Sequence, residues 1–317
     1  MKRKHLAFLL FIPLGFVLGC QSTMINMTKP IMIELLVKPA FDAFLEEDDV
    51  ELAFQAIGGQ LKLVEIMKQK INRNEVKLLL CRGFASYGLL LEPRLNRLKY
   101  KADNTDKEDE RKQLTKEVDK LTARIRRMAL RGRSHCFNMI EAKYPGFLKA
   151  MEKGQKDYHN ILKKMTKADV DIMFWAGFGW GYALINGLSE TDLIAKVPQL
   201  KALMHRIVEL DGTYFYGAGH LFLATLYAQS KTLGGDLKKS NAHFEKAYKH
   251  SNNKLLLVDL YKARFYAKQA TDTAMCKKLL TKIKKTSVHV FPKVNLMNAL
   301  AKELGEIASL DVDEFCP

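Results

Sequence analysis

The amino-acid sequence predicts an all-α protein built from stacked antiparallel helix pairs. Almost every stretch after residue 30 repeats its apolar residues at intervals of three and four, which is the spacing of one helix face. No stretch alternates apolar and polar residues between hairpin turns, as a half-buried strand would. The prolines stand where helices would begin or end, and those that support this reading are Pro39, Pro93, Pro145, Pro198 and Pro292.

The chain begins with the pattern of a bacterial lipoprotein signal. Residues 2–4 are all basic and an apolar stretch follows at 6–18, interrupted by a proline and a glycine and too short to span a bilayer. Residues 17–20, Val-Leu-Gly-Cys, resemble the lipobox. We therefore expect residues 1–19 to be a signal peptide and Cys20 to be lipidated. A permanent transmembrane helix is the weaker alternative, and Gln21 after the cysteine favours the outer membrane.

The charge of the chain is strongly positive. Its net charge is +16, and removal of the three basic residues of the signal leaves +13. A protein with this charge in the cytosol would suggest a nucleic-acid partner, but we expect none for an envelope lipoprotein. Anionic lipid headgroups, acidic partners and anionic solutes remain open, as does a diffuse, solvated lysine surface.

The first half of the mature chain is expected to contain a tether, a helix pair and a charged hairpin. We assign residues 20–40 to the tether and first helix, and 41–317 to a single all-α tetratricopeptide-like domain. One helix pair is expected from 52–67 into 78–89. An antiparallel hairpin insertion at about 91–130 follows from a narrow apolar seam on both sides of a polar tip. Whether this arm contacts a partner or is only a solvated extension is left open.

Helix pairs recur in the second half, from residue 169 to residue 283. Residues 175–182 follow the tetratricopeptide first-helix pattern W-x2-L-G-x2-Y, with Phe in the Leu place. Pro198 is expected to open a helix, and the Gly-Gly-Asp run at 234–236 a turn between two helices. Repeats of this kind leave a concave surface that binds peptides, helices or small ligands.

Four cysteines remain if Cys20 carries lipid. They permit three pairings, and the sequence does not choose among them. One or two disulfides are open, although we expect at least two of the thiols to be unpaired core residues. These cysteines are Cys81, Cys136, Cys276 and Cys316.

The sequence contains no recognisable catalytic or metal-binding motif. It lacks HExxH, GxSxG and a phosphate-binding loop, and the glycine run at 177–181 has no preceding strand, so helix packing explains it better than a dinucleotide site. We therefore expect no enzyme activity, no cofactor and no metal. The histidines fall on different helices or helix ends and are interpreted as scattered: His205, His220, His243 and His250.

An unusual concentration of aromatic residues lies at 174–182 and 214–227. Such residues cover more than one face of a helix, so some of them must point away from the seam between paired helices. They are candidates for lining a cleft, although filling of the core is the alternative reading. The candidate ligand-binding residues are Trp180, Tyr182, Tyr214, Tyr216 and His220.

The same segments resemble a known family. Residues 174–181, the Glu-Leu-Asp run at 209–211, residues 216–223 and the turn at 234–236 together resemble the T component (TatT) of tripartite ATP-independent periplasmic (TRAP) transporter systems. The resemblance spans about residues 45 to 285. It implies an all-helical lipoprotein with cryptic tetratricopeptide-like pairs, and it supplies no catalytic residues.

The resemblance also implies partners. The protein is expected to face the periplasm, held on the membrane by a lipid anchor, most simply on the periplasmic face of the outer membrane. Its expected partner is the periplasmic solute-binding protein of a TRAP system, with an organic or hydrophobic solute as a further ligand. A homo-oligomer is left open. The alternative is a tetratricopeptide-like envelope scaffold for the assembly of outer-membrane proteins or lipoproteins.

Overall fold

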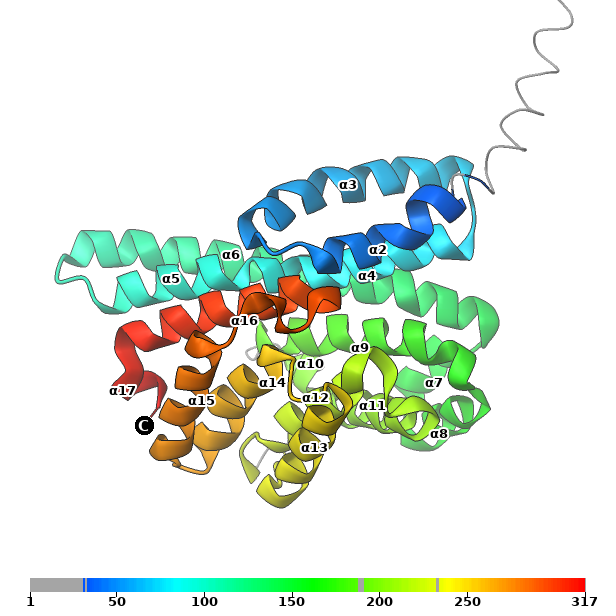
Figure 1. The fold of residues 1–317 in the computed structure, drawn as a ribbon. Helices are drawn as coiled ribbons and strands as arrows, with labels where there is room; N and C mark the ends of the chain where they lie inside the picture. Colours follow the sequence, from blue (N-terminus) through cyan, green and yellow to red (C-terminus); the bar gives the residue numbers. More distant parts are fainter. Residues whose placement is uncertain (1–30, 32, 188–190, 232–233, 317) are drawn as a thin grey trace, which may run out of the picture.

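A computed structural model describes residues 31, 33–187, 191–231 and 234–316 (Figure 1). Within these residues every regular element is a helix, so the all-α prediction is confirmed. The expected signal peptide and Cys20 lie outside the described residues. Along the described part of the chain, no helix is both long and apolar enough to cross a membrane.

The α-helices in chain order are α2 (Lys38–Glu46), α3 (Val50–Lys70), α4 (Asn74–Leu90), α5 (Glu92–Asp103), α6 (Glu108–Lys143), α7 (Phe147–Lys153), α8 (Gln155–Lys164), α9 (Val170–Ile185), α10 (Thr191–Ala195), α11 (Val197–Asp211), α12 (Tyr214–Tyr227), α13 (Leu237–His250), α14 (Leu256–Tyr261), α15 (Thr273–Lys285), α16 (Asn295–Ala308) and α17 (Val312–Phe315). Two π-helical segments are η1 (Ile33–Val37) and η4 (Lys262–Ala267). The 3-10 segments are η2 (Lys167–Asp169), η5 (Val288–Val290), η6 (Pro292–Val294) and η7 (Ser309–Asp311).

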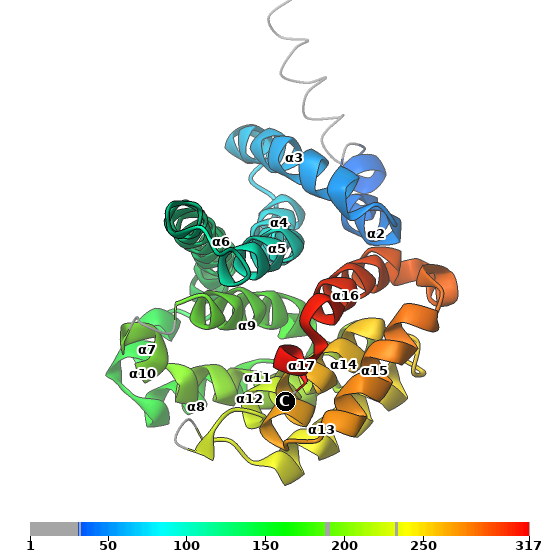
Figure 2. The same cartoon turned by 90° about the vertical axis from the view of Figure 1, so that its left-hand side faces the viewer.

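Helices α4, α6 and α9 pack on one another, with α9 between the α4–α6 pair and the lower helices α8 and α11 (Figure 2). Glycines allow this close approach. A Cβ atom on Gly132 of α6 would stand 2.3 Å from the backbone nitrogen of Ala85 in α4, and one on Gly179 of α9 would stand 2.8 Å from the carbonyl oxygen of Ala129 in α6. Neither contact leaves room for a side chain, so the glycines set the spacing of the three helices.

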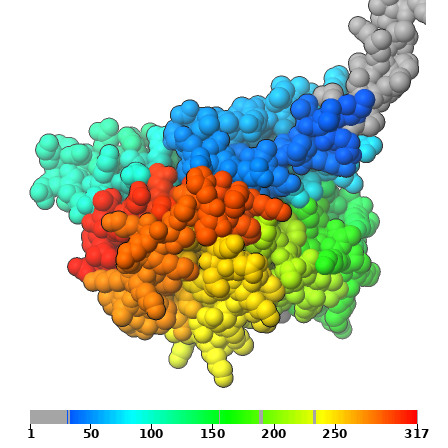
Figure 3. Space-filling model, viewed as in Figure 1, coloured from blue at the N-terminus to red at the C-terminus, as the bar shows by residue number. Residues whose placement is uncertain are grey.

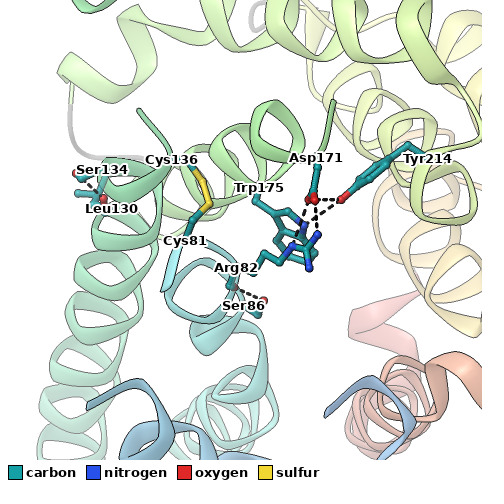
Figure 4. Close-up of a disulfide and its surroundings, with 9 residues drawn as sticks. All are labelled: Cys81, Arg82, Ser86, Leu130, Ser134, Cys136, Asp171, Trp175 and Tyr214. Atoms are coloured by element: carbon teal, nitrogen blue, oxygen red, sulfur yellow. Dashed lines mark hydrogen bonds and ion pairs between the residues drawn. A yellow bond between two sulfur atoms is a disulfide. The ribbon is translucent and has the colours of Figure 1, made fainter. Parts of the chain in front are cut away.

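All four cysteines after Cys20 are paired, so the expectation of two free core thiols is wrong. Cys81 of α4 bonds Cys136 of α6 (Figure 4), and Cys276 of α15 bonds Cys316 near the C-terminus. The Cα atoms of the two pairs are 5.3 and 5.6 Å apart, within the range that a disulfide requires. This proximity arises from packing of helices that are distant in the sequence, which the spacing of the cysteines does not reveal.

The second half of the chain is a succession of packed helices. α9, α11, α12 and α13 each contact the next in turn, and α14 with η4 leads on to α15 and α16. Pro198 lies in the first turn of α11, where the sequence predicts the start of a helix. Helix α16 then returns across the molecule and packs against α2, α3 and α5 (Figures 1 and 2). The first and last parts of the described chain therefore share one core.

Helices α5 and α6 form the antiparallel hairpin that the sequence predicts. Leu95 and Ile125 are buried in its seam, while the residues around the tip, 103–112, are almost all exposed. α5 also packs on α16, where Arg97 pairs with Glu303 at 2.9 Å. Only the outer half of the hairpin therefore stands clear of the body (Figure 3).

Candidate functional site

The described residues enclose a cavity of about 330 Å³ between α4 and α5 on one side and α9, α12, η4 and α16 on the other. Residues of one face of α9 form much of its wall, because positions 174, 178, 181 and 185 recur at intervals of three and four. The aromatic residues of the lining are Phe174, Trp175, Phe178, Tyr182, Phe215, Phe222, Tyr261 and Phe265. Leucine, isoleucine, valine and methionine side chains supply most of the remaining wall.

A buried ion pair interrupts the apolar wall of the cavity. Glu92, in the first turn of α5, pairs with Arg264 of η4 and accepts a hydrogen bond of 2.6 Å from the hydroxyl of Tyr182. The side chains of Glu92 and Arg264 are 8% and 29% exposed. Burial opposes the charge of Arg264, but the paired Glu92 raises the pKa of Arg264 above its usual range. The two charges thus compensate each other, and the cavity carries no net charge from this pair.

The lining tyrosines remain protonated. Burial, reinforced by Glu92, raises the pKa of Tyr182 well above its ordinary value. The same two causes raise the pKa of Tyr261. The hydroxyl of Ser86 donates to the carbonyl oxygen of Arg82, at 2.6 Å. The lining hydroxyls of Tyr182, Ser86 and Thr225 thus each donate to an oxygen of the protein itself.

A hydrogen-bond network behind the cavity wall fixes the position of Trp175 (Figure 4). Its indole nitrogen donates to the hydroxyl of Tyr214 at 3.1 Å, and that hydroxyl donates to Asp171 at 2.7 Å. Asp171 in turn pairs with Arg82 of α4. Burial, followed by the nearby Asp171, raises the pKa of Tyr214, so its proton remains in place. The network therefore holds one aromatic wall of the cavity in a single orientation.

A family comparison identifies the chain. A model described as TRAP transporter T-component matches residues 46–314. The chain belongs to the TRAP transporter T-component family. It is also 26% identical over 205 residues to an uncharacterized protein of Treponema pallidum (strain Nichols), covering 64% of this chain and 60% of that protein. The chain thus spans less than two thirds of the length of that relative. The family's description implies a component associated with a TRAP transporter.

Of the five ligand-binding candidates that the sequence suggested, the structure brings only Tyr182 of this T component to the cavity wall. Trp180 is 1% exposed and packs in the core against Phe137, with ring centroids 5.7 Å apart. Tyr216 packs edge-on against Phe291 at 4.5 Å. Tyr214 lies in the network behind the wall, and His220 contacts other histidines.

A left-handed turn at the start of α12 explains much of this difference. Phe215, Tyr216 and Gly217 have φ angles of 45°, 59° and 83°. Bulky residues rarely adopt this conformation, and it breaks the regular helical positions that the sequence predicted here. As a result Phe215 lines the cavity whereas Tyr216 does not. Nothing local in the sequence, apart from the glycine at 217, signals this turn.

The sequence also failed to predict that four histidines would lie together. The Nδ1 atoms of His220 in α12 and His243 in α13 are 2.9 Å apart, and the ring of His250 stacks on His220 at 5.6 Å. His205 of α11 lies 6.2 Å from His243, ring to ring. These histidines lie on different helices, as the sequence predicts, but packing of α11, α12 and α13 gathers them into one cluster, so they are not scattered in the fold. Burial, with Lys246 and neighbouring histidines as further causes, lowers the pKa values of His220 and His243 to about 4.

The ion pair of the cavity was likewise absent from the candidate ligand-binding residues that the sequence suggested. Glu92 and Arg264 are 172 residues apart in the sequence, and neither belongs to a motif. One local feature of the sequence points to Glu92. Glu92 directly precedes a proline at the start of a helix, where a carboxylate is favoured by the helix dipole and can still face inward.

Proposed function

We propose that this chain is a lipid-anchored accessory component that binds the solute-binding protein of a TRAP transport system and accepts an organic solute in its cavity. The observation that carries the solute part of the proposal is the cavity between α5, α9, α12 and η4. Family membership supports the association with a transport system. The signal-like segment 1–19 and Cys20 support a place in the envelope, on the periplasmic face of the outer membrane.

The lining indicates the kind of solute. A volume of about 330 Å³ lies at the lower end of the range for small-molecule sites, and aromatic walls favour an apolar body. The ion pair of Glu92 and Arg264 is internally compensated, but Lys99 also lines the cavity and can meet an anionic group of the solute. The polar atoms near the ion pair can orient a further polar group.

The partner is tested by capture from the native envelope. The tagged full-length protein is extracted with its membrane, and the proteins and small molecules that remain bound are identified by mass spectrometry. Recovery of a periplasmic solute-binding protein is the expected result. Recovery of outer-membrane assembly factors alone would contradict the transport proposal and favour the scaffold alternative.

The cavity is tested with the uncharged fluorophore 1-aminoanthracene, whose emission rises in apolar surroundings. Ala218 lines the cavity, so Ala218→Phe should fill part of the space and weaken binding at least about tenfold. Leu310→Ser provides a control, because this leucine is 53% exposed in η7 and does not line the cavity. Equal binding by both variants would show that the fluorophore does not enter the cavity.

A further inference from the structure

The outer face of α6 carries a row of cations along the hairpin. The row repeats at intervals of four, four, four, three and four residues, which keeps its members on one face of a helix. That face lies opposite the positions that α6 buries in the hairpin seam, such as Leu121, Ile125 and Ala129. The row spans about 28 Å, and we call it the basic ridge. Its members are Lys112, Lys116, Lys120, Arg124, Arg127 and Arg131.

The middle of the basic ridge is unpaired and open to solvent. Among the residues that the structure describes, Lys116, Lys120 and Arg127 are exposed and pair with no acid. Arg124 is also exposed and donates a hydrogen bond of 2.6 Å to the neutral hydroxyl of Tyr87. Only the first and the last member of the ridge form ion pairs, with acids of α6 and α3 respectively.

This arrangement of charges does not help the helix that carries it. Like charges four residues apart on a helix repel each other, whereas opposite charges at that spacing attract. The ridge places like charges at this spacing four times. No acid stands within the ridge between residues 112 and 131, because Glu117 and Asp119 lie at its two edges. An anionic partner therefore explains the ridge better than helix stability does.

The charges around the ridge favour a protein partner over a lipid surface. A uniformly anionic bilayer would also meet Glu117, Asp119 and the hairpin tip, where four of residues 106–110 are acids. Of the large apolar side chains that are exposed in the described part of the chain, none lies on α5 or α6, so the hairpin offers none to the interfacial layer. A protein face with a single row of carboxylates can match the ridge and avoid the acids beside it.

The hairpin also links the ridge to the solute cavity. α5 packs directly against α6, and Leu95, Asn96 and Lys99 of α5 line the cavity. The axes of packed helices lie about 8–10 Å apart. Only the thickness of the hairpin therefore separates a partner on the ridge from the cavity.

We propose that the basic ridge is the docking surface for an acidic face of the solute-binding protein. The inference rests on the proposed function, which names this partner but not the surface that holds it. The ridge suits a row of carboxylates of similar length on the partner. Attraction between two such rows speeds the encounter of the proteins and fixes their relative position, which the transfer of a solute between them requires.

The test measures how much solute-binding protein the tagged, full-length chain captures from its own envelope, by mass spectrometry. Lys116→Glu with Lys120→Glu should lower the recovery at least about tenfold, and recovery by the starting protein should fall as salt is raised. Each substituted position lies four residues from a remaining cation, Lys112 or Arg124, so the variant should be no less stable than the starting protein. Urea unfolding followed by circular dichroism checks this.

Lys149→Glu with Lys156→Glu provides the matched control. Both lysines are exposed and lie in the first turns of α7 and α8, where a carboxylate is favoured by the helix dipole. These helices are at the opposite end of the molecule from the hairpin tip (Figure 1). The control changes the net charge by the same amount as the ridge variant, and its recovery of the partner should be unchanged.

The outcomes separate the ridge from the proposed function. Equal recovery by the ridge variant and the starting protein would overturn the docking surface and leave the proposed function intact. Equal loss in the ridge and control variants would show general charge attraction and would overturn it too. If the starting protein captures no solute-binding protein, the proposed partner itself is wrong. Loss of binding to phosphatidylglycerol vesicles by a ridge variant that still captures the partner would assign the ridge to lipid instead.

Discussion

The ion pair in the cavity wall makes a quantitative prediction. Glu92→Gln removes the charge but keeps an amide oxygen that can accept the hydrogen bond from Tyr182. Arg264 is then left without its partner in a largely apolar surrounding. Loss of one partner of a fully buried pair costs about 3–5 kcal/mol. Because the Arg264 side chain is 29% exposed, solvent relieves part of this, and we expect a loss of about 2 kcal/mol in the free energy of unfolding.

A double-mutant cycle isolates this effect. Arg264→Met removes the unpaired guanidinium, so the variant that combines it with Glu92→Gln should lose less stability than the sum of the single variants. Urea unfolding followed by circular dichroism at neutral pH provides the four free energies. Additive losses, or a cost of less than about 0.5 kcal/mol for Glu92→Gln, would refute the view that the two charges compensate each other inside the cavity.

Three further predictions concern the rest of the molecule. The pKa values of His220 and His243 fall to about 4, below the ~6.5 of an unfolded histidine, so the unfolded chain binds more protons between these values and stability should drop as pH is lowered through them. After allowance for solvent screening we expect the free energy of unfolding to fall by about 2 kcal/mol between pH 7 and pH 4.5. A variant with both histidines changed to Asn should lose this pH dependence, and a variant that keeps it in full would contradict its assignment to these histidines. Gly132→Ala should cost about 3 kcal/mol in urea unfolding because its methyl group would strike the backbone of Ala85, whereas Gly58→Ala, with open space around it, should be neutral or stabilising. Reduction of the disulfides, which close segments of 55 and 40 residues, should lower the free energy of unfolding by about 4 kcal/mol each in the chain-entropy account, and an unchanged melting temperature with reductant would argue against both.

The helices were predictable because their signals are local. The apolar spacing of α5 and α6, the proline at the start of α11 and the turn before α13 all lie within a few residues of the element that they define. The family resemblance was predictable for the same reason, since its motifs are short runs in a fixed order, and the match to residues 46–314 confirms it. Pairwise packing of consecutive helices follows from such signals without knowledge of the tertiary structure.

The candidate site was predicted only in part because its geometry is not local. One helix face of α9 explains why Tyr182 reaches the cavity and Trp180 does not. Aromatic residues lie on more than one face of this helix, and nothing local in the sequence distinguishes the face that meets the cavity. The left-handed turn at 215–217 redirects the next group of aromatic residues. Glu92 and Arg264 meet only because η4, which lies 172 residues further along the chain, packs beside the start of α5. No pattern within a window of the sequence encodes such a meeting.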